Sequence, residues 1–189
     1  MAIVIDTCSL VAMARYYLPL DINGILTNFI KEGLETGEII LLDAIQQEAI
    51  YTSQGIAIKA MPYLKEVKYA VNTTEIFLPS PKKFHNLVDN NFCVRLLKNE
   101  LTEEEYVLQK EEFLKSGDGR IIVYCMYRKE QYQIMPASIS VLTEETKSQN
   151  DGKLFQKLPS ICEFLKINTI TLTEYLKVHG IKIERVNAG

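Results

Sequence analysis

The stretch Ala2-Ile3-Val4-Ile5-Asp6 opens the chain and carries its clearest fold signal, because four consecutive apolar residues end at a carboxylate. A continuous apolar run of this kind is typical of a strand that is covered on both faces, as the strands of parallel sheets are. We therefore expect residues 2–6 to form a central strand. Asp6 then lies at the carboxyl end of that strand, where open α/β sheets bind their ligands.

Apolar runs and helical periodicities alternate along the rest of the chain. The predicted strands cover residues 2–6, 38–42, 137–143 and 169–171, with a turn at 79–81 and an edge strand at 181–186. The predicted helices cover residues 21–35, 43–51, 56–70, 84–99, 102–115, 120–128, 159–166 and 173–179. For residues 120–128 a strand remains the alternative, since many of their side chains are β-branched. The alternation predicts an α/β fold with a mostly parallel central sheet and helices on both faces.

The pattern is least regular between residues 55 and 115, where helical segments follow one another without a long strand. This insertion has few residues with which to build a core of its own, so we expect a helical lobe laid on the sheet within one domain of residues 1–189. Helix starts are indicated where a capping residue is followed three positions later by Glu or Gln. The predicted capping boxes are Asp43 with Gln46 and Thr102 with Glu105.

The composition is that of a globular protein, with 47% hydrophobic and 24% charged residues. No apolar run approaches the roughly 20 residues that cross a bilayer, and no signal peptide is recognisable, so we expect a cytoplasmic protein without a membrane partner. The four cysteines form no CxxC pair, which favours buried free thiols over zinc or disulfides. The net charge of −3 argues weakly against nucleic acid, although a basic rim remains open. Its candidate members are Lys82, Lys83, Arg95, Lys98, Arg120, Arg128 and Lys129.

Four carboxylates stand where a predicted strand meets a loop or a helix. They are Asp6, Glu48, Asp118 and Glu145. Acidic groups that gather at the carboxyl edge of a sheet repel one another unless a cation lies between them. The set therefore suggests a hard divalent metal ion and the hydrolysis of a phosphate ester. The structural alternatives are a turn cap for Asp6 and a helix N-cap for Asp118, which stands between two glycines.

Glu48 and Glu145 each have competitors in the sequence. Glu48 shares a helical face with apolar residues, whereas Asp43 is already explained by its predicted cap role. Glu145 stands two residues after a threonine, so in an extended chain both side chains point to the same side, and we prefer it to Glu144 and Asp151. Each assignment is weak alone, and the order of the four acids along successive elements carries the argument.

Other chemistries find little support. His85 and His179 have no partner at metal-ligand spacing, and both are expected to be ordinary structural residues. Cys8 and Ser9 are potential nucleophiles, yet no base stands near them in the sequence. The chain also lacks a GxSxG turn, a glycine-rich phosphate loop and a P-loop lysine.

The four acids and the residues around them, taken in their order along the sequence, resemble the PIN domain. This is a family of metal-dependent nucleases that includes the VapC-type toxins of bacterial toxin–antitoxin pairs. The resemblance covers nearly the whole chain. Its motifs are Val4-Ile5-Asp6-Thr7-Cys8-Ser9-Leu10, Glu48 on a helix, the helix start Gly117-Asp118, and Val141-Leu142-Thr143-Glu144-Glu145. The later stretch Lys157-Leu158-Pro159-Ser160-Ile161-Cys162 is similar to a PIN-like subgroup of unassigned function.

The resemblance implies an endoribonuclease that depends on Mg²⁺ or Mn²⁺. Asp6 and Asp118 are then expected to bind the metal ion, with Glu48 and Glu145 completing the set directly or through water. Thr7 and Thr143 are expected to hold these ligands by hydrogen bonds. The implied partners are RNA, an antitoxin protein and a second copy of the chain.

At two positions the chain departs from the family pattern. Cys8 stands where the family commonly has Asn or Ser, and Glu145 stands where it usually has Asp. These departures motivate a second hypothesis, a catalytically silent PIN-like module that binds RNA or protein. A third hypothesis is a phosphatase or phosphotransferase of the haloacid dehalogenase type with Asp6 as nucleophile. It ranks last, because such enzymes carry a second Asp at the position of Cys8.

Overall fold

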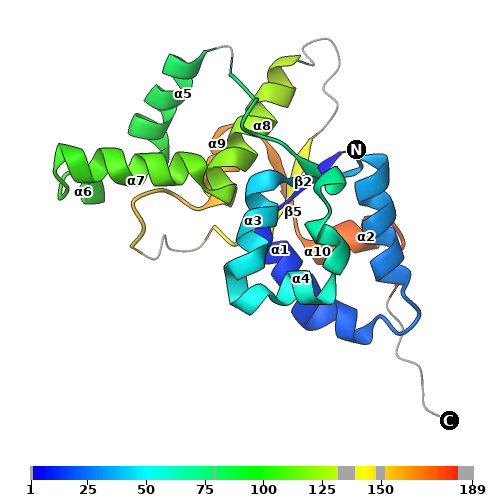
Figure 1. Cartoon of the computed structure of the whole chain (residues 1–189). Helices are drawn as coiled ribbons and strands as arrows, with labels where there is room; N and C mark the ends of the chain where they lie inside the picture. The colour runs from blue at the N-terminus through cyan, green and yellow to red at the C-terminus, as the bar shows by residue number, and fades with distance from the viewer. Residues whose placement is uncertain (1, 79, 132–138, 148–151, 183–189) are drawn as a thin grey trace.

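A parallel sheet organises the computed structural model, which describes residues 2–78, 80–131, 139–147 and 152–182 (Figure 1). Within these residues, five strands pair in the order β3-β2-β1-β4-β5, and every pairing is parallel. The strands are β1 (Ile3–Ile5), β2 (Ile39–Leu42), β3 (Ala70–Val71), β4 (Ser140–Leu142) and β5 (Asn168–Ile170). The predicted α/β fold with a parallel sheet is thereby confirmed.

Helices flank this sheet and connect its strands (Figure 1). The α-helices are α1 (Thr7–Ala12), α2 (Ile25–Thr36), α3 (Asp43–Tyr51), α4 (Ile56–Ala60), α5 (Pro81–Leu87), α6 (Arg95–Lys98), α7 (Glu103–Lys115), α8 (Gly117–Gln131), α9 (Leu158–Phe164) and α10 (Leu172–Val178). Short π-helical segments occupy Met13–Tyr17 and Val88–Phe92. Short 3₁₀ segments occupy Leu18–Leu20, Thr52–Gly55, Pro62–Lys65 and Val67–Tyr69. None of the helices in the described residues is long and apolar enough to cross a membrane.

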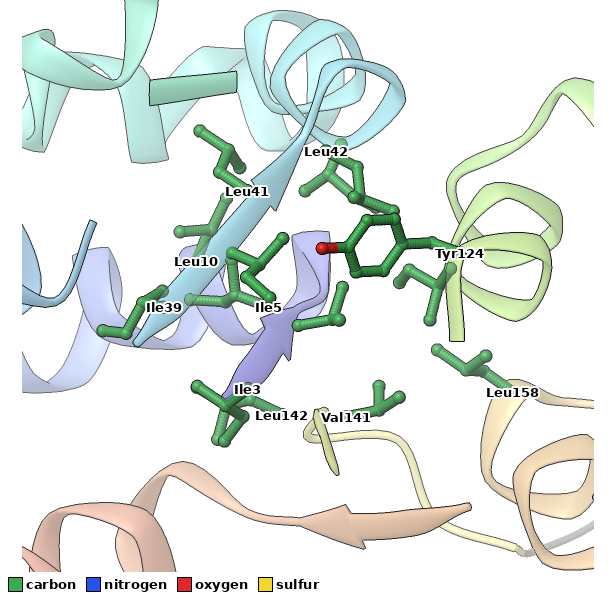
Figure 2. Packing of buried hydrophobic residues seen from close by; sticks show 14 of the residues in the cluster. Ile3, Ile5, Leu10, Ile39, Leu41, Leu42, Tyr124, Val141, Leu142 and Leu158 are labelled. Carbon is green, nitrogen blue, oxygen red and sulfur yellow. The ribbon is translucent and has the colours of Figure 1, made fainter. Parts of the chain in front are cut away.

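The centre of the core is β1, as the opening apolar run predicts. Ile3, Val4 and Ile5 are at most 1% exposed, although consecutive strand residues point to opposite faces. Both faces of the sheet are therefore covered at this strand. Figure 2 shows how side chains of β1, β2 and β4 pack together with Leu10 of α1 and Tyr124 of α8. This packing fixes the register in which Ile3 lies beside Ile39 on one side and Ser140 on the other.

Two predicted helices are wrong in part. The helix expected over residues 56–70 ends at Ala60, because Pro62 disfavours a helical conformation of Met61 before it and cannot continue the helical hydrogen bonds. The rest of that range forms 3₁₀ turns and the beginning of β3. The helix expected over residues 84–99 starts earlier, at Pro81, and is interrupted at Cys93. There the backbone is extended and forms an antiparallel bridge with Phe155, a long-range pairing that overrides local helix propensity.

The predictions of helix starts had mixed outcomes. Thr102 and Glu105 form the predicted capping box of α7. The box predicted for Asp43 and Gln46 is wrong, because Asp43 already lies in the first turn of α3 and the amide of Gln46 donates instead to the carbonyl of Leu64. The sequence reasoning missed α1, the helical turns as far as residue 20 and the capping box of Thr171 with Glu174. Residues 120–128 are helical, as the preferred interpretation held.

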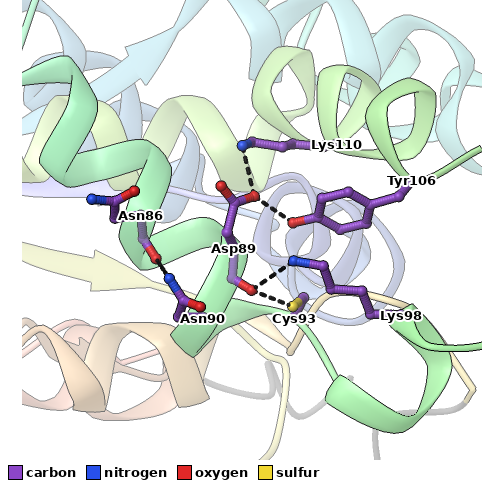
Figure 3. Close-up of polar contacts among 7 residues, drawn as sticks. All are labelled: Asn86, Asp89, Asn90, Cys93, Lys98, Tyr106 and Lys110. Carbon is purple, nitrogen blue, oxygen red and sulfur yellow. Dashed lines mark hydrogen bonds and ion pairs between the residues drawn. The ribbon is translucent and has the colours of Figure 1, made fainter. Parts of the chain in front are cut away.

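The helical lobe is held together by a polar cluster around Asp89 (Figure 3). The carboxylate of Asp89 accepts a hydrogen bond from Tyr106 and forms an ion pair of 2.6 Å with Lys110, both on α7. Lys98 of α6 donates to the backbone carbonyl of Asp89 and lies over the ring of Tyr106. These contacts fix the π-helical segment Val88–Phe92 against α7, so the segment that follows it has a defined position.

Some predictions fall wholly or partly outside the described residues, namely the turn residue Pro79, residues 137–138 of the predicted strand, Asp151 and residues 183–186 of the predicted edge strand. All four cysteines lie within the described residues and are free thiols. Cys93, Cys125 and Cys162 are buried, and Cys8 is partly buried. The predicted buried free thiols are therefore confirmed for Cys93, Cys125 and Cys162, whereas Cys8 is a free thiol that lines a cavity.

Candidate functional site

A cavity of about 970 Å³ opens beyond the carboxyl ends of β1 and β4. All four carboxylates singled out in the sequence line it, although they come from four different parts of the chain. Asp6 follows β1, Glu48 lies on α3, Asp118 is the second residue of α8, and Glu145 follows β4. The fold thus brings the predicted residues to one place, at the edge of the sheet where ligands of α/β proteins bind.

Asp6 is the most buried of the four, with 4% of its surface exposed. Although it precedes α1, its side chain makes no capping hydrogen bond to that helix, so the structural alternative of a cap does not explain it. Its Oδ2 atom accepts hydrogen bonds from the Thr143 hydroxyl at 2.9 Å and from the Cys8 thiol at 2.8 Å. Burial raises the pKa of Asp6, and these two hydrogen bonds act in the opposite direction.

Cys8 fixes the cavity wall around Asp6. Its sulfur also accepts a hydrogen bond from the backbone N–H of Glu144, 3.2 Å away, and lies 3.3 Å from the Thr143 hydroxyl. Burial, followed by the charge of Asp6, raises the pKa of the Cys8 thiol to about 12. The thiol therefore stays protonated at neutral pH and acts as a hydrogen-bond donor rather than a nucleophile.

The carboxylate of Glu48 accepts hydrogen bonds from the first residues of two helices, α1 and α8. One carboxylate oxygen accepts from the backbone N–H of Gly117 at 2.6 Å, and the other accepts from the Thr7 hydroxyl at 2.8 Å. A Cβ atom at position 117 would lie only 2.6 Å from the Glu48 carboxylate and 2.5 Å from Ile45. Glycine at this position therefore allows the close approach of Glu48 and Ile45.

The raised pKa of Asp118 indicates that the four carboxylates interact electrostatically. Burial, followed by the negative charges of Asp6, Glu145 and Glu48, raises the pKa of Asp118 to about 8, and Lys153 opposes this shift. Asp118 lies inside α8 rather than at its N-cap position, so the cap interpretation fails for this residue. The next glycine, Gly119, has a packing role, because the backbone carbonyl of Phe113 occupies the space of a Cβ atom.

Glu144 and Glu145 have different roles although both line the cavity. Glu144 accepts a hydrogen bond of 2.6 Å from the backbone N–H of Leu172 and so caps the start of α10. The Oε2 atom of Glu145 is buried and has no hydrogen-bond partner within the described part of the chain. Asp43, the competitor of Glu48, does not line the cavity and accepts a hydrogen bond from Thr73 instead.

The cavity has further walls that the sequence reasoning missed. Its cationic residues are Arg15, Lys153 and Lys157, and none of the seven candidates for a basic rim lines it. Phe113 and Phe155 add an aromatic wall. The alternation Lys153-Leu154-Phe155-Gln156-Lys157 is visible in the sequence, but its position beside the acids depends on the bridge between Cys93 and Phe155.

The pKa of Asp118 leads to a first prediction, on stability in the presence of a chelator. Its folded-state value of about 8 lies above its unfolded value of about 4, so the folded protein holds a proton over this interval. The stabilising contribution of the protonated carboxyl is complete below the unfolded pKa and is lost as pH rises through the folded pKa. We therefore expect the melting temperature to fall between about pH 5 and pH 9.

The Asp118→Asn variant keeps the shape of the side chain and cannot ionise, so much of this fall should disappear in the variant. Thermal denaturation followed by circular dichroism in EDTA measures both proteins across the pH range. Above about pH 8 the variant should be the more stable protein. Parallel curves for the two proteins would show that Asp118 does not carry the repulsion.

Comparisons with known proteins give one match. Residues 3–183 match a family model described as "Domain of unknown function (DUF4411)". No curated protein and no solved structure matches the chain.

Proposed function

This chain belongs to the DUF4411 family, and we propose that it is a metal-dependent ribonuclease of the PIN-domain type. One observation carries the proposal. Four carboxylates from distant parts of the sequence converge on one cavity, where burial, followed by their mutual repulsion, raises the pKa of Asp118 to about 8. Like charges gathered in a partly buried site destabilise a fold unless a cation or a proton compensates them, and such arrangements are typical of functional sites.

The donor set fits a hard divalent cation. The acids offer only oxygen atoms, which suit Mg²⁺ and Mn²⁺, and the Oε2 atom of Glu145 is a buried acceptor still without a partner within the described residues. Those residues contain no group of three or more His, Cys, Asp or Glu side chains already spaced to hold an ion. Side-chain movements of Asp118 and Glu145 toward Asp6 are therefore part of the proposal.

Each residue has a defined part in this mechanism. When bound, the metal ion supplies a water of lowered pKa and positive charge beside the scissile phosphate. Asp6 and Asp118 would hold the ion, and Glu145 would complete its shell. Cys8 and Thr143 keep Asp6 in position through their hydrogen bonds to Oδ2. Removing such supporting partners typically lowers metal affinity or activity by about 10- to 100-fold.

A catalytically silent module that binds RNA or protein is the second candidate, and the geometry of Glu48 favours it. Both carboxylate oxygens of Glu48 accept hydrogen bonds within the protein, from Gly117 and Thr7. Glu48 therefore has an architectural role that does not need a metal ion. In the ribonuclease, Glu48 would act through the charge it adds to the cavity and through a bridging water.

Metal binding distinguishes the two candidates. An ion that binds only the folded state at about 100 times its Kd adds about 2.7 kcal/mol to the free energy of unfolding. In a domain of this size, that stabilisation raises the melting temperature by roughly 5–10 °C. We expect this rise with millimolar Mn²⁺, together with Mn²⁺-dependent cleavage of single-stranded RNA that EDTA abolishes.

Two variants show whether the ion binds in the cavity. Asp6→Asn should lose most of the rise in melting temperature, whereas Asp43→Asn should keep it, because Asp43 does not line the cavity. A shift of equal size in wild type and Asp6→Asn would place the bound ion elsewhere on the acidic surface. No shift and no cleavage in wild-type protein would favour the silent module.

A further inference from the structure

Residues 152–157, here called the strap, form one wall of the cavity and are fixed to the helical lobe. The backbone N–H of Val94 donates to the carbonyl of Leu154, and the N–H of Gln156 donates to the carbonyl of Phe92, both at 2.8 Å. The side chain of Gln156 adds a hydrogen bond to the carbonyl of Asn91. The strap is therefore held in place by its backbone and by the side chain of Gln156.

The strap carries a lysine, an aromatic ring and a lysine at alternate positions, 153, 155 and 157. The chain bends at Leu154, and Phe155 pairs with Cys93 in an antiparallel bridge. All three residues line the cavity. Lys153 is also close enough to the carboxylates to oppose the raised pKa of Asp118. The two lysines and the ring thus belong to the same cavity as the acids.

Phe155 has the geometry of a supported stacking platform. Its ring lies on that of Phe113, with 4.3 Å between the ring centroids and 16° between the ring planes. Phe113 is buried and belongs to α7, whereas Phe155 remains only partly buried. Phe113 belongs to the hydrophobic core and Phe155 packs against it, so the ring of Phe155 has a fixed position in the cavity wall.

We propose that the strap is the nucleic-acid binding track of this site, with an unpaired base stacked on Phe155 and backbone phosphates bound by Lys153 and Lys157. The inference rests on the proposed ribonuclease activity and specifies how its substrate is held. Single-strand binding proteins combine aromatic stacking with cationic contacts to the backbone, which is the combination present here. A duplex presents no free base face, so the strap would select single-stranded over double-stranded RNA.

The test is binding without cleavage. Fluorescence anisotropy in EDTA measures the affinity for a labelled, unstructured RNA of about a dozen nucleotides and for the duplex of the same sequence. Phe155→Leu keeps an apolar side chain but removes the stacking surface, so the affinity for the single strand should fall about tenfold. Phe155→Tyr should restore binding. The matched control is Phe164→Leu, which changes a ring that is 51% exposed and does not line the cavity.

The lysines are tested through the salt dependence of binding. Each phosphate contact to a single strand adds about 0.7 to the slope of log affinity against log salt. The double variant Lys153→Gln, Lys157→Gln should therefore reduce that slope by about 1.4, whereas Phe155→Leu should leave it unchanged. The double variant Lys82→Gln, Lys83→Gln on α5 carries the same charge change away from the cavity and should keep the wild-type slope.

The outcomes separate this inference from the proposed activity. Binding that depends on Phe155 and the two lysines, without cleavage in Mn²⁺, would support the strap and overturn the ribonuclease. Cleavage with wild-type affinity in all strap variants would overturn the strap and leave the ribonuclease standing. If Phe155→Leu fails to fold, the test rests on the double lysine variant alone. A slope of log affinity against log salt equal to that of the wild type would then overturn the proposal.

Discussion

Asp118→Asn is expected to lower Mn²⁺-dependent cleavage of single-stranded RNA by at least about 100-fold while the chain stays folded. The substitution removes the negative charge and keeps the size of the side chain. In the proposed mechanism, that charge holds the ion that acidifies the attacking water and neutralises the transition state. Initial rates on a labelled RNA oligonucleotide, with folding checked by circular dichroism, measure the effect.

A neighbouring pair of glutamates provides the control for this experiment. Glu145→Gln should reduce cleavage as Asp118→Asn does, because both side chains contribute charge to the cavity. Glu144→Gln should have little effect, since an amide oxygen still accepts the hydrogen bond from Leu172 at the start of α10. Equal rates for wild type and Asp118→Asn, unaffected by chelator, would exclude a metal-dependent nuclease centred on Asp118.

Gly119→Ala is expected to cause the largest loss of stability, roughly 2–4 kcal/mol. A Cβ atom at this position overlaps the backbone carbonyl of Phe113, and the Cα atom of Leu114 lies only 3.1 Å away. Backbone atoms of α7 cannot rotate aside, so α7 and α8 must separate. Urea denaturation measures the loss as a lower midpoint with an unchanged slope.

Gly33→Ala is the matched control, because it also places an alanine inside a helix. The new Cβ atom would approach only side-chain atoms of Ile39, the nearest at 2.6 Å, and a side chain can change its rotamer. Both substitutions gain the same helix propensity of about 1 kcal/mol, so their difference isolates the backbone overlap. Similar losses for the two variants would contradict this explanation.

Strands β1, β2, β4 and β5 could be predicted because their signal is local, whereas the two-residue strand β3 was missed. Residues 3–5 and 39–42 are continuous apolar runs, and burial on both faces of a parallel sheet requires this pattern. The segment after Asp6 was missed because Thr7 and Ser9 read as loop residues. Both are buried in α1, where the Ser9 hydroxyl donates to the carbonyl of Leu142 on a distant strand. Only the folded chain supplies that partner.

The members of the candidate site could be predicted, and so could two of its hydrogen-bond donors, because Thr143 donates to Asp6 and Thr7 donates to Glu48 as the resemblance implies. Asp6, Asp118 and Glu145 were found because each stands at the end or start of an element, and Glu48 was found because it shares a helical face with apolar residues. The roles of the surrounding residues depend on contacts between segments that are far apart in sequence. The backbone N–H of Glu144 contacts Cys8 across 136 positions, and that of Gly117 contacts Glu48 across 69. No local pattern encodes such pairs.

The pairing of β1 with β4 has a consequence for synthesis of the chain on the ribosome. Asp6 is made early, but its partner Thr143 follows 137 residues later. At the usual elongation rate this interval lasts roughly 7–30 s, and closing so long a loop must wait until β4 has emerged. During this time Asp6 has Cys8 beside it but lacks Thr143, and the cavity wall formed by Glu144 and Glu145 is missing. The four carboxylates can therefore come together only after β4 has been made, so the candidate site forms late relative to the strand that carries Asp6.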